Sequence, residues 1–263
     1  MGVRVGIVKK KTEYVLLFLL VCLMSVSCGS GKKQVFVPAE GDADEKTLST
    51  DSQNEFQYQY PSEGDLCADV EILNYGHIYV KLFREDAPYA VENFTRKAKK
   101  GEYNGSLVSE AVNDYYLQCG KPMDSEKKEE SIWGGGFSNE ISDRLFPTRG
   151  SLCMANQGVD GTNAMQFFFV ANAPETIRKL EEPLKERYGI GLNEYLEKYY
   201  SVKMDRKDLV RYFNYGGAPW LYGHNTVFGQ VFRGFDVMDA VISAMAETEN
   251  GIYIKKISIY NYI

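Results

Sequence analysis

The chain has 263 residues, of which 44% are hydrophobic and 25% are charged, the composition of an ordinary globular protein. Its 30 basic and 36 acidic residues give a net charge of −6, which argues against nucleic acid as a partner. Because His77 and His224 are the only histidines, a multi-histidine metal site is excluded. No nucleotide-binding loop or serine-hydrolase motif occurs, and we expect neither a metal nor a cofactor.

Residues 1–27 have the pattern of an export signal. Four basic residues precede an apolar run over 14–26, which is too short to span a bilayer comfortably. Small residues then lead into Cys28, similar to the cleavage box of bacterial lipoproteins, although Ser25 stands where that box usually has leucine. We expect a lipid on Cys28 and a membrane-anchored chain facing the periplasm of the bacterial cell envelope. A plain secretory signal and an uncleaved anchor are the alternatives.

The segment 28–62 is polar and acidic without sustained periodicity, which predicts a flexible tether ahead of a folded domain over 63–263. That domain holds three cysteines, Cys67, Cys119 and Cys153, each within an apolar or β-like run. We expect buried free thiols, and a bridge between Cys119 and Cys153 is the alternative.

Short stretches of apolar and β-branched residues, separated by turn residues, predict a mainly β domain. We expect strands over 66–73, 77–83, 107–112, 115–119, 150–155, 166–171, 227–232 and 252–260. Asp86 is expected to cap a helix with Pro88 in its first turn, and a second amphipathic helix is expected over 235–245. Lys255 and Lys256 interrupt the last strand like a bulge. Many short strands with two helices favour a closed barrel.

The pattern changes between 173 and 218, where apolar residues recur at helical spacing. This predicts a helical insertion within the same domain. Because the insertion leaves after Asn172 and returns at Trp220, we expect it to extend or cover a neighbouring cleft.

Several segments, in this order, resemble the cyclophilin family of peptidyl-prolyl isomerases. They are 87–94, 131–137, 150–156, 166–168 and 225–231. The resemblance extends from about residue 66 to the end, apart from the insertion, and the order of the motifs makes it specific. It implies an eight-stranded antiparallel barrel capped by two helices, with a site on its outer face for proline-containing segments of exported proteins.

The chemistry of such a site is simple. Rotation about an Xaa-Pro amide is opposed by roughly 18–20 kcal/mol, because the nitrogen donates electrons into the carbonyl. A catalyst holds the ring in an apolar pocket, binds the preceding carbonyl and favours the twisted amide, without a nucleophile or a cofactor. In cyclophilins an arginine also donates a hydrogen bond toward the prolyl nitrogen.

The resemblance assigns peptide-binding roles to eleven positions. It implies that Phe168 is the floor of the proline pocket, that Leu221 is its wall and that Trp220 is the tryptophan beside that wall. Core packing is the alternative for these three residues. The other implied contacts, some of them departing from the usual family residue, are Tyr115, Tyr116, Gln118, Ala155, Asn156, Gln157, Gln166 and Asn225.

Glu110 is the largest departure from the family. It lies eight residues before Gln118, where the family has its catalytic arginine. A carboxylate has no proton to donate at neutral pH, and the loss of one preorganised donor typically costs about 10²–10³-fold in rate. We expect a weak isomerase that assists the folding of exported proteins. The alternative is a prolyl-peptide-binding module or chaperone with little catalysis, in which Glu110 is a plain exposed carboxylate.

Overall fold

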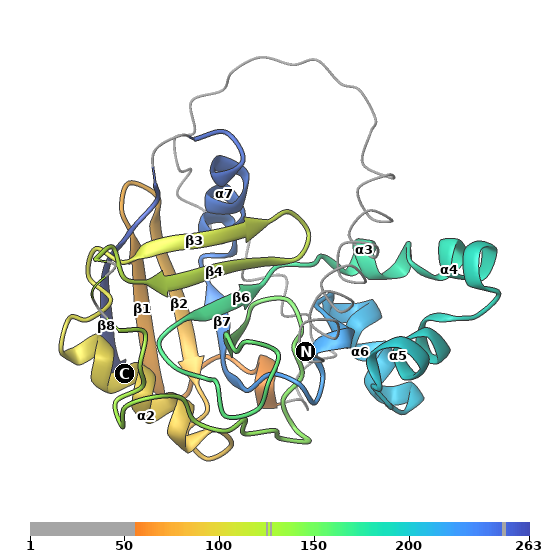
Figure 1. The fold of residues 1–263 in the computed structure, drawn as a ribbon, viewed down its shortest axis with the longest axis horizontal. Helices are drawn as coiled ribbons and strands as arrows, with labels where there is room; N and C mark the ends of the chain where they lie inside the picture. The colour runs from red at the N-terminus through yellow and green to blue at the C-terminus, as the bar shows by residue number, and fades with distance from the viewer. Residues whose placement is uncertain (1–55, 125, 127, 249–250) are drawn as a thin grey trace, which may run out of the picture.

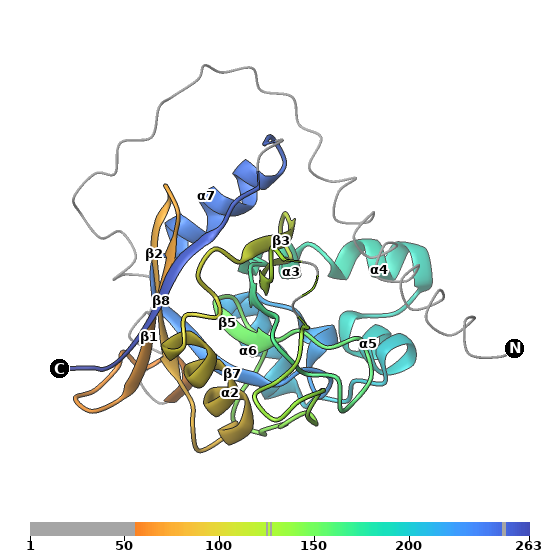
Figure 2. The ribbon, with the colours of Figure 1, turned by 60° about the vertical axis from the view of Figure 1, so that its left-hand side comes forward.

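A computed structural model describes residues 56–124, 126, 128–248 and 251–263 (Figure 1). Its largest part is an eight-stranded antiparallel sheet with the order β3-β4-β6-β5-β7-β2-β1-β8. The strands are β1 (Leu66–Ile72), β2 (Gly76–Leu82), β3 (Leu107–Val112), β4 (Tyr116–Lys121), β5 (Ser151–Met154), β6 (Phe167–Val170), β7 (Val227–Arg233) and β8 (Ile254–Asn261). Helices α2 (Pro88–Lys99) and α7 (Phe235–Met245) lie at opposite ends of the sheet (Figures 1 and 2). The mainly β architecture predicted from the sequence is confirmed.

The sheet is an open half-barrel, so the prediction of a closed barrel was wrong. The edge strands β3 and β8 meet at one end, where Leu107 bridges to Tyr253 and the Val108 N–H donates to the Ile252 carbonyl at 2.9 Å. At the same end, the Ile254 N–H donates to the Ser106 carbonyl at 2.9 Å, and the Ile254 carbonyl accepts from the Gly105 N–H at 2.8 Å. The expected bulge explains the separation. In the register with β1, β8 skips Lys255, and a bulge bends its strand immediately after the last contact with β3.

Strand alternation divides the buried residues into two clusters. The inner cluster fills the half-barrel between the sheet, α2 and α7, and includes Phe94, Phe167, Phe169 and Phe228. The outer cluster lies on the other face of the same strands and includes Phe168, Cys153 and Val170. Because side chains alternate along a strand, the run of three phenylalanines in β6 contributes to both clusters.

A distant side chain caps helix α2. The carboxylate of Glu140 accepts hydrogen bonds from the N–H groups of Tyr89 and Ala90 at 3.0 and 2.8 Å. Asp86, the expected cap, instead accepts from Arg144 Nη2 at 2.8 Å, and the N-cap position is Ala87 without a side-chain cap. The prediction of an Asp86 cap was therefore wrong, whereas Pro88 does occupy the first turn.

Four helices form a lobe beside the sheet, seen at the right of Figure 1: α3 (Pro174–Arg178), α4 (Glu181–Tyr188), α5 (Leu192–Tyr200) and α6 (Arg206–Tyr215). A short 3-10 turn, η4 (Pro219–Leu221), follows them. The lobe begins and ends at one place, because the Gly217 N–H donates to the Asn172 carbonyl at 2.9 Å. Gly217 has a φ of 111°, and a Cβ there would lie 2.3 Å from Thr148 Cα, so this return requires glycine.

The last residues of the predicted tether are folded onto the domain. The turn η3 (Phe56–Tyr58) buries Gln57, whose amide donates to the Phe146 carbonyl at 2.8 Å and to Gln230 Oε1 at 3.0 Å. Gln57 Oε1 in turn accepts from the Phe146 N–H at 2.9 Å. The ordered domain therefore begins before residue 63. The predicted signal, Cys28 and most of the tether lie outside the described residues.

The three cysteines of the domain, Cys67, Cys119 and Cys153, are buried and unpaired, as expected. Burial is the main cause that raises the pKa of the Cys67 thiol to about 11. Among the described helices, none combines the length and the apolar character needed to cross a bilayer.

Candidate peptide-binding site

An aromatic group forms where β4, β6 and η4 meet. The ring centroids of Tyr116 and Phe168 are 5.9 Å apart at an interplanar angle of 65°. Tyr115 packs edge-on against Tyr116 at 4.7 Å, and its hydroxyl accepts a 2.9 Å hydrogen bond from Trp220 Nε1. Three segments that are distant in sequence therefore bring these predicted site residues together.

The aromatic group lies at the edge of the outer cluster. Phe168, Trp220 and Leu221 are only 6%, 3% and 7% exposed, so they also pack as core residues. Tyr115 and Tyr116 are half-buried and form the more accessible part of the group. A peptide ring placed here would contact mainly the two tyrosines and the edges of the buried residues beneath them.

A bulge in β3 positions Glu110. Val108 pairs with Cys119 and Glu110 pairs with Gln118, so Ser109 is an extra residue in β3. A bulge of this kind places two side chains opposite one residue of the partner strand. Ser109 and Glu110 therefore both lie beside Gln118.

The Glu110 carboxylate lies close enough to the Tyr116 hydroxyl to affect its pKa. Burial raises the pKa of Tyr116, and the nearby negative charge and hydrogen bond of Glu110 raise it further. The phenol therefore remains a protonated donor at physiological pH. At the position that the sequence resemblance assigns to the catalytic arginine, this chain thus has an exposed glutamate beside a tyrosine.

A polar group continues from Glu110 along the sheet. Gln118 Nε2 donates to Gln166 Oε1 at 2.9 Å, and Ser109 Oγ donates to the same oxygen at 3.1 Å. Gln166 Nε2 donates to the carboxylate of Glu129. These bonds fix both ends of the Gln166 side chain and connect the two predicted glutamines directly.

The predicted edge segment, 155–157, is held by internal hydrogen bonds. The Ala155 N–H donates to the Gln166 carbonyl at 3.0 Å, and the Gln157 N–H donates to Thr162 Oγ1 at 2.9 Å. Backbone groups alternate in direction along an extended segment, so those of Asn156 point to the other side. The Asn156 side chain donates to the His224 carbonyl at 3.0 Å, and it thereby connects the edge segment to the loop after η4, which together form the rim of the site.

Asn225 and His224 connect this rim to the rest of the domain. Asn225 Nδ2 donates to the Met154 carbonyl at 3.2 Å, which fixes the loop after η4. His224 Nε2 lies 2.9 Å from the Tyr200 carbonyl at the end of α5, so this nitrogen carries the hydrogen. The helical lobe therefore contacts the loop that borders the site.

Sequence reasoning missed Glu129, Ser109 and Tyr200 as neighbours of the site. Glu129 follows β4 in a loop without periodicity, and no local pattern connects it to Gln166. Tyr200 lies in the helical lobe, whose contacts depend on packing between distant segments. The bulge at Ser109 depends on the strand register and has no glycine to mark it.

Comparison with known proteins places these elements in one family. A family model for cyclophilin type peptidyl-prolyl cis-trans isomerases matches residues 67–262. A relative from Staphylococcus haemolyticus, whose name assigns it to the peptidyl-prolyl cis-trans isomerases, is 34% identical over 205 residues, or 75% of this chain and 92% of its own. A similarly named relative from Staphylococcus epidermidis is 33% identical over 211 residues, with the same coverage of both chains.

Solved structures agree on the fold. A cyclophilin type isomerase from Cryptosporidium parvum aligns with a TM-score of 0.54 and 23% identity, covering 76% of this chain and 99% of that one. The same protein in the presence of the dipeptide Ala-Pro aligns with a TM-score of 0.53 and 23% identity, covering 74% and 99%. From the half-barrel, the motif order and these matches, the chain belongs to the cyclophilin-type peptidyl-prolyl cis-trans isomerase family.

Proposed function

We propose that this chain is a slow prolyl isomerase that assists the folding of exported proteins in the bacterial envelope. The observation that carries the reduced rate is the contact between Glu110 and the Tyr116 hydroxyl beside Phe168. An aromatic surface for a proline ring is present, but the residue at the arginine position accepts a hydrogen bond instead of donating one.

The remaining machinery supports binding and twisting of the amide. Tyr116 and Phe168 offer ring faces and edges to the prolyl ring, and Gln118 lies beside them on β4 with an amide able to meet the peptide backbone. These contacts lower the barrier where they fit the twisted amide better than the planar one. No step needs a cofactor, because no bond is broken.

Replacing the anion with the family's donor tests this proposal. We expect Glu110→Arg to raise kcat/KM for an Xaa-Pro peptide by about 10²–10³-fold, since it restores one preorganised donor. Glu110→Gln is the matched control, because it removes the charge without supplying a guanidinium, and we expect a much smaller gain. A protease-coupled or NMR exchange assay measures all three proteins.

Two results would overturn the reduced-rate proposal. One is wild-type activity as high as that of an efficient cyclophilin. The other is a Glu110→Arg variant that stays folded, binds peptide and gains no rate, which would show that another group, such as Lys121, limits turnover.

A binding module with little or no catalysis is the second candidate function, and the same Glu110 contact favours it. The two functions differ in one measurement. If proline peptides bind and their cis–trans exchange rate, followed by NMR, remains that of free peptide, the chain is a prolyl-peptide-binding module or chaperone.

The location of the protein is part of this proposal and rests on the sequence pattern that ends at Cys28. We propose that the chain is lipidated there, faces the periplasm, and meets proline-containing segments of exported proteins close to the membrane. Mass spectrometry of the mature N-terminus, with Cys28→Ala as the comparison, tests this. An unmodified Cys28 or membrane attachment that persists in Cys28→Ala would contradict it.

A further inference from the structure

Two carboxylates border the proposed peptide site from different segments. Glu110 lies on β3 beside Gln118, and Glu129 lies in the loop after β4, where it accepts a hydrogen bond from Gln166. Since Gln118 donates to Gln166 at 2.9 Å, the two carboxylates lie at opposite ends of one connected polar group. Both hydrogen-bond donors, Tyr116 and Gln166, are uncharged.

Two cations among the described residues form ion pairs with other carboxylates. Lys128 lies 3.4 Å from Glu130, and Arg144 lies 2.8 Å from Asp86. Lys121, at the end of β4, is exposed, and the register shift at Gly120 separates it from Cys119 and Gln118. Among the described residues, no lysine, arginine or histidine forms an ion pair with Glu110 or Glu129.

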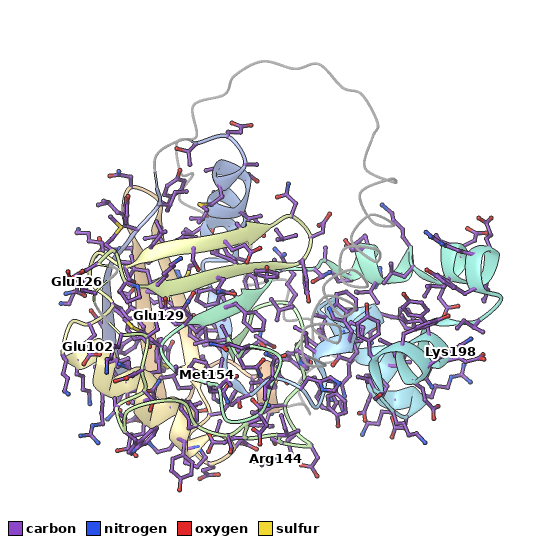
Figure 3. All side chains as sticks on the ribbon, in the orientation of Figure 1. Glu102, Glu126, Glu129, Arg144, Met154 and Lys198 are labelled. Carbon is purple, nitrogen blue, oxygen red and sulfur yellow. The ribbon has the colours of Figure 1, made fainter. Side chains whose placement is uncertain are left out.

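Figure 3 labels Glu126 and Glu129 on the side of the sheet and Lys198 on the helical lobe. By the resemblance, Glu110 stands where the family has an arginine, so the charge at this one position is opposite to that of the family pattern.

We propose that the site selects proline segments that carry lysine or arginine within two residues of the proline. This inference rests on the proposed function and names its substrate class. The proline ring meets the aromatic group, and the cation meets Glu110 or Glu129 at one end of the polar group. An acidic residue in the same position is repelled, so selection has an attractive and a repulsive part.

The expected size follows from exposed ion pairs. Each such pair contributes about 1.4- to 5-fold in affinity, and one cation meets only one of the two carboxylates, so a peptide with one lysine should be favoured by up to about 5-fold over a neutral one. Because exposed charges are screened, the preference should nearly disappear in 1 M salt, where the Debye length is about 3 Å.

The experiment uses matched peptides that differ only in the residues around proline. One set places lysine, alanine or glutamate before proline and another places them after it. Affinity is measured by NMR titration, and isomerisation by exchange, at about 50 mM and 1 M salt. The proteins are wild type, Glu110→Gln, Glu129→Gln and the double variant. Glu182→Gln serves as the control, since Glu182 is an exposed carboxylate on α4.

We expect the wild type to prefer lysine over alanine over glutamate in at least one set. For each peptide, the variant that lacks the contacted carboxylate should lose about 1.4- to 5-fold of that preference, the double variant should lose most of it for every peptide, and Glu182→Gln should lose none. Equal binding of all proline peptides would overturn this inference and leave the proposed function intact. A preference that survives in the double variant would also overturn it. Failure to bind or turn over any proline peptide would instead overturn the proposed function.

Discussion

The inner and outer clusters are built from the same strands but depend on different parts of the chain. The inner cluster is closed by α2 and α7, and its side chains come from the sheet and from elements of the family pattern. The outer cluster combines Phe168 of β6 and Trp220 of η4 with Leu196 of α5 and Tyr212 of α6. The inner face of the sheet therefore forms the core of the half-barrel. The outer face packs against the helical lobe and includes the residues of the proposed site.

This difference teaches that the proposed site is not carried by the half-barrel alone. Tyr58 of η3 stacks on Tyr215 at the end of α6, with ring centroids 4.1 Å apart. The lobe therefore packs against η3, the segment that leads into the domain. It also contacts the loop after η4, because Tyr200 of α5 accepts a hydrogen bond from His224. The proposed site therefore has contacts with the helical lobe, which in turn packs on η3. The inner cluster includes no residue of the lobe or of η3.

Breaking the inner cluster should have the largest effect. Phe94 is fully buried, and its ring meets those of Phe167 and Phe228 at 5.2 and 5.4 Å. We expect Phe94→Ala to lower the free energy of unfolding by about 3–5 kcal/mol, because it removes buried surface and leaves a cavity. Chemical denaturation followed by circular dichroism measures the loss.

A matched truncation on the exposed face of the same helix is the control. Tyr89 is 57% exposed, and Tyr89→Ala should cost about 1 kcal/mol or less. If Phe94→Ala and Tyr89→Ala lowered the free energy of unfolding equally, Phe94 would not be a core residue of the inner cluster.

Breaking the outer cluster should cost less stability but disturb the site. Leu196 is fully buried on α5, which has solvent on its other face and can shift toward a cavity. We expect Leu196→Ala to cost about 2–3 kcal/mol and to weaken the binding of proline peptides. Trp220 reports the local change, because Trp133 is the only other tryptophan and can be removed as Trp133→Phe.

The measurement compares Trp220 fluorescence and peptide affinity in the Trp133→Phe background with and without Leu196→Ala. A loss of stability with unchanged emission and unchanged affinity would show that the lobe packs on the domain without supporting the site. That result would contradict the claim that the proposed site depends on packing in the outer cluster.

Local pattern was enough to predict most of the strands and both helices of the half-barrel. Alternation located β1 and β2 to within a residue or two, and the two lysines correctly indicated the bulge at Lys255. The same bulge bends β8 away from β3, but strand closure depends on three-dimensional twist, and the pattern of residues did not reveal it.

Contacts between distant segments account for what the sequence could not show. Glu140 caps a helix that begins more than 50 residues earlier, so Asp86 was the only cap visible locally. Gln57 is polar and follows an acidic stretch, yet it is buried because Phe146 and Gln230 satisfy its amide. The identity of the site residues came from motif order, but the contact of Glu110 with Tyr116 required the strand register.

The smallest expected effect on stability concerns the ion pair between Asp65 and Lys81, beside strands β1 and β2. Asp65 Oδ2 lies 2.8 Å from Lys81 Nζ and accepts from the Ser62 N–H at 2.8 Å. Burial acts to raise the pKa of Asp65, but these hydrogen bonds and the charge of Lys81 outweigh it and hold the pKa below its usual value.

A carboxylate with a lowered pKa in the folded state stabilises the fold above its unfolded pKa of about 3.9, and this contribution is lost as the pH falls through the folded value. Because Asp65 is partly exposed, we expect Asp65→Asn to cost only about 0.2–1 kcal/mol at pH 7. The difference between the wild type and the variant in urea unfolding should narrow as the pH falls below about 4 and disappear below the folded-state pKa of Asp65. A gap that stays constant or widens on acidification would show that Asp65 stabilises the fold by packing and not by its charge.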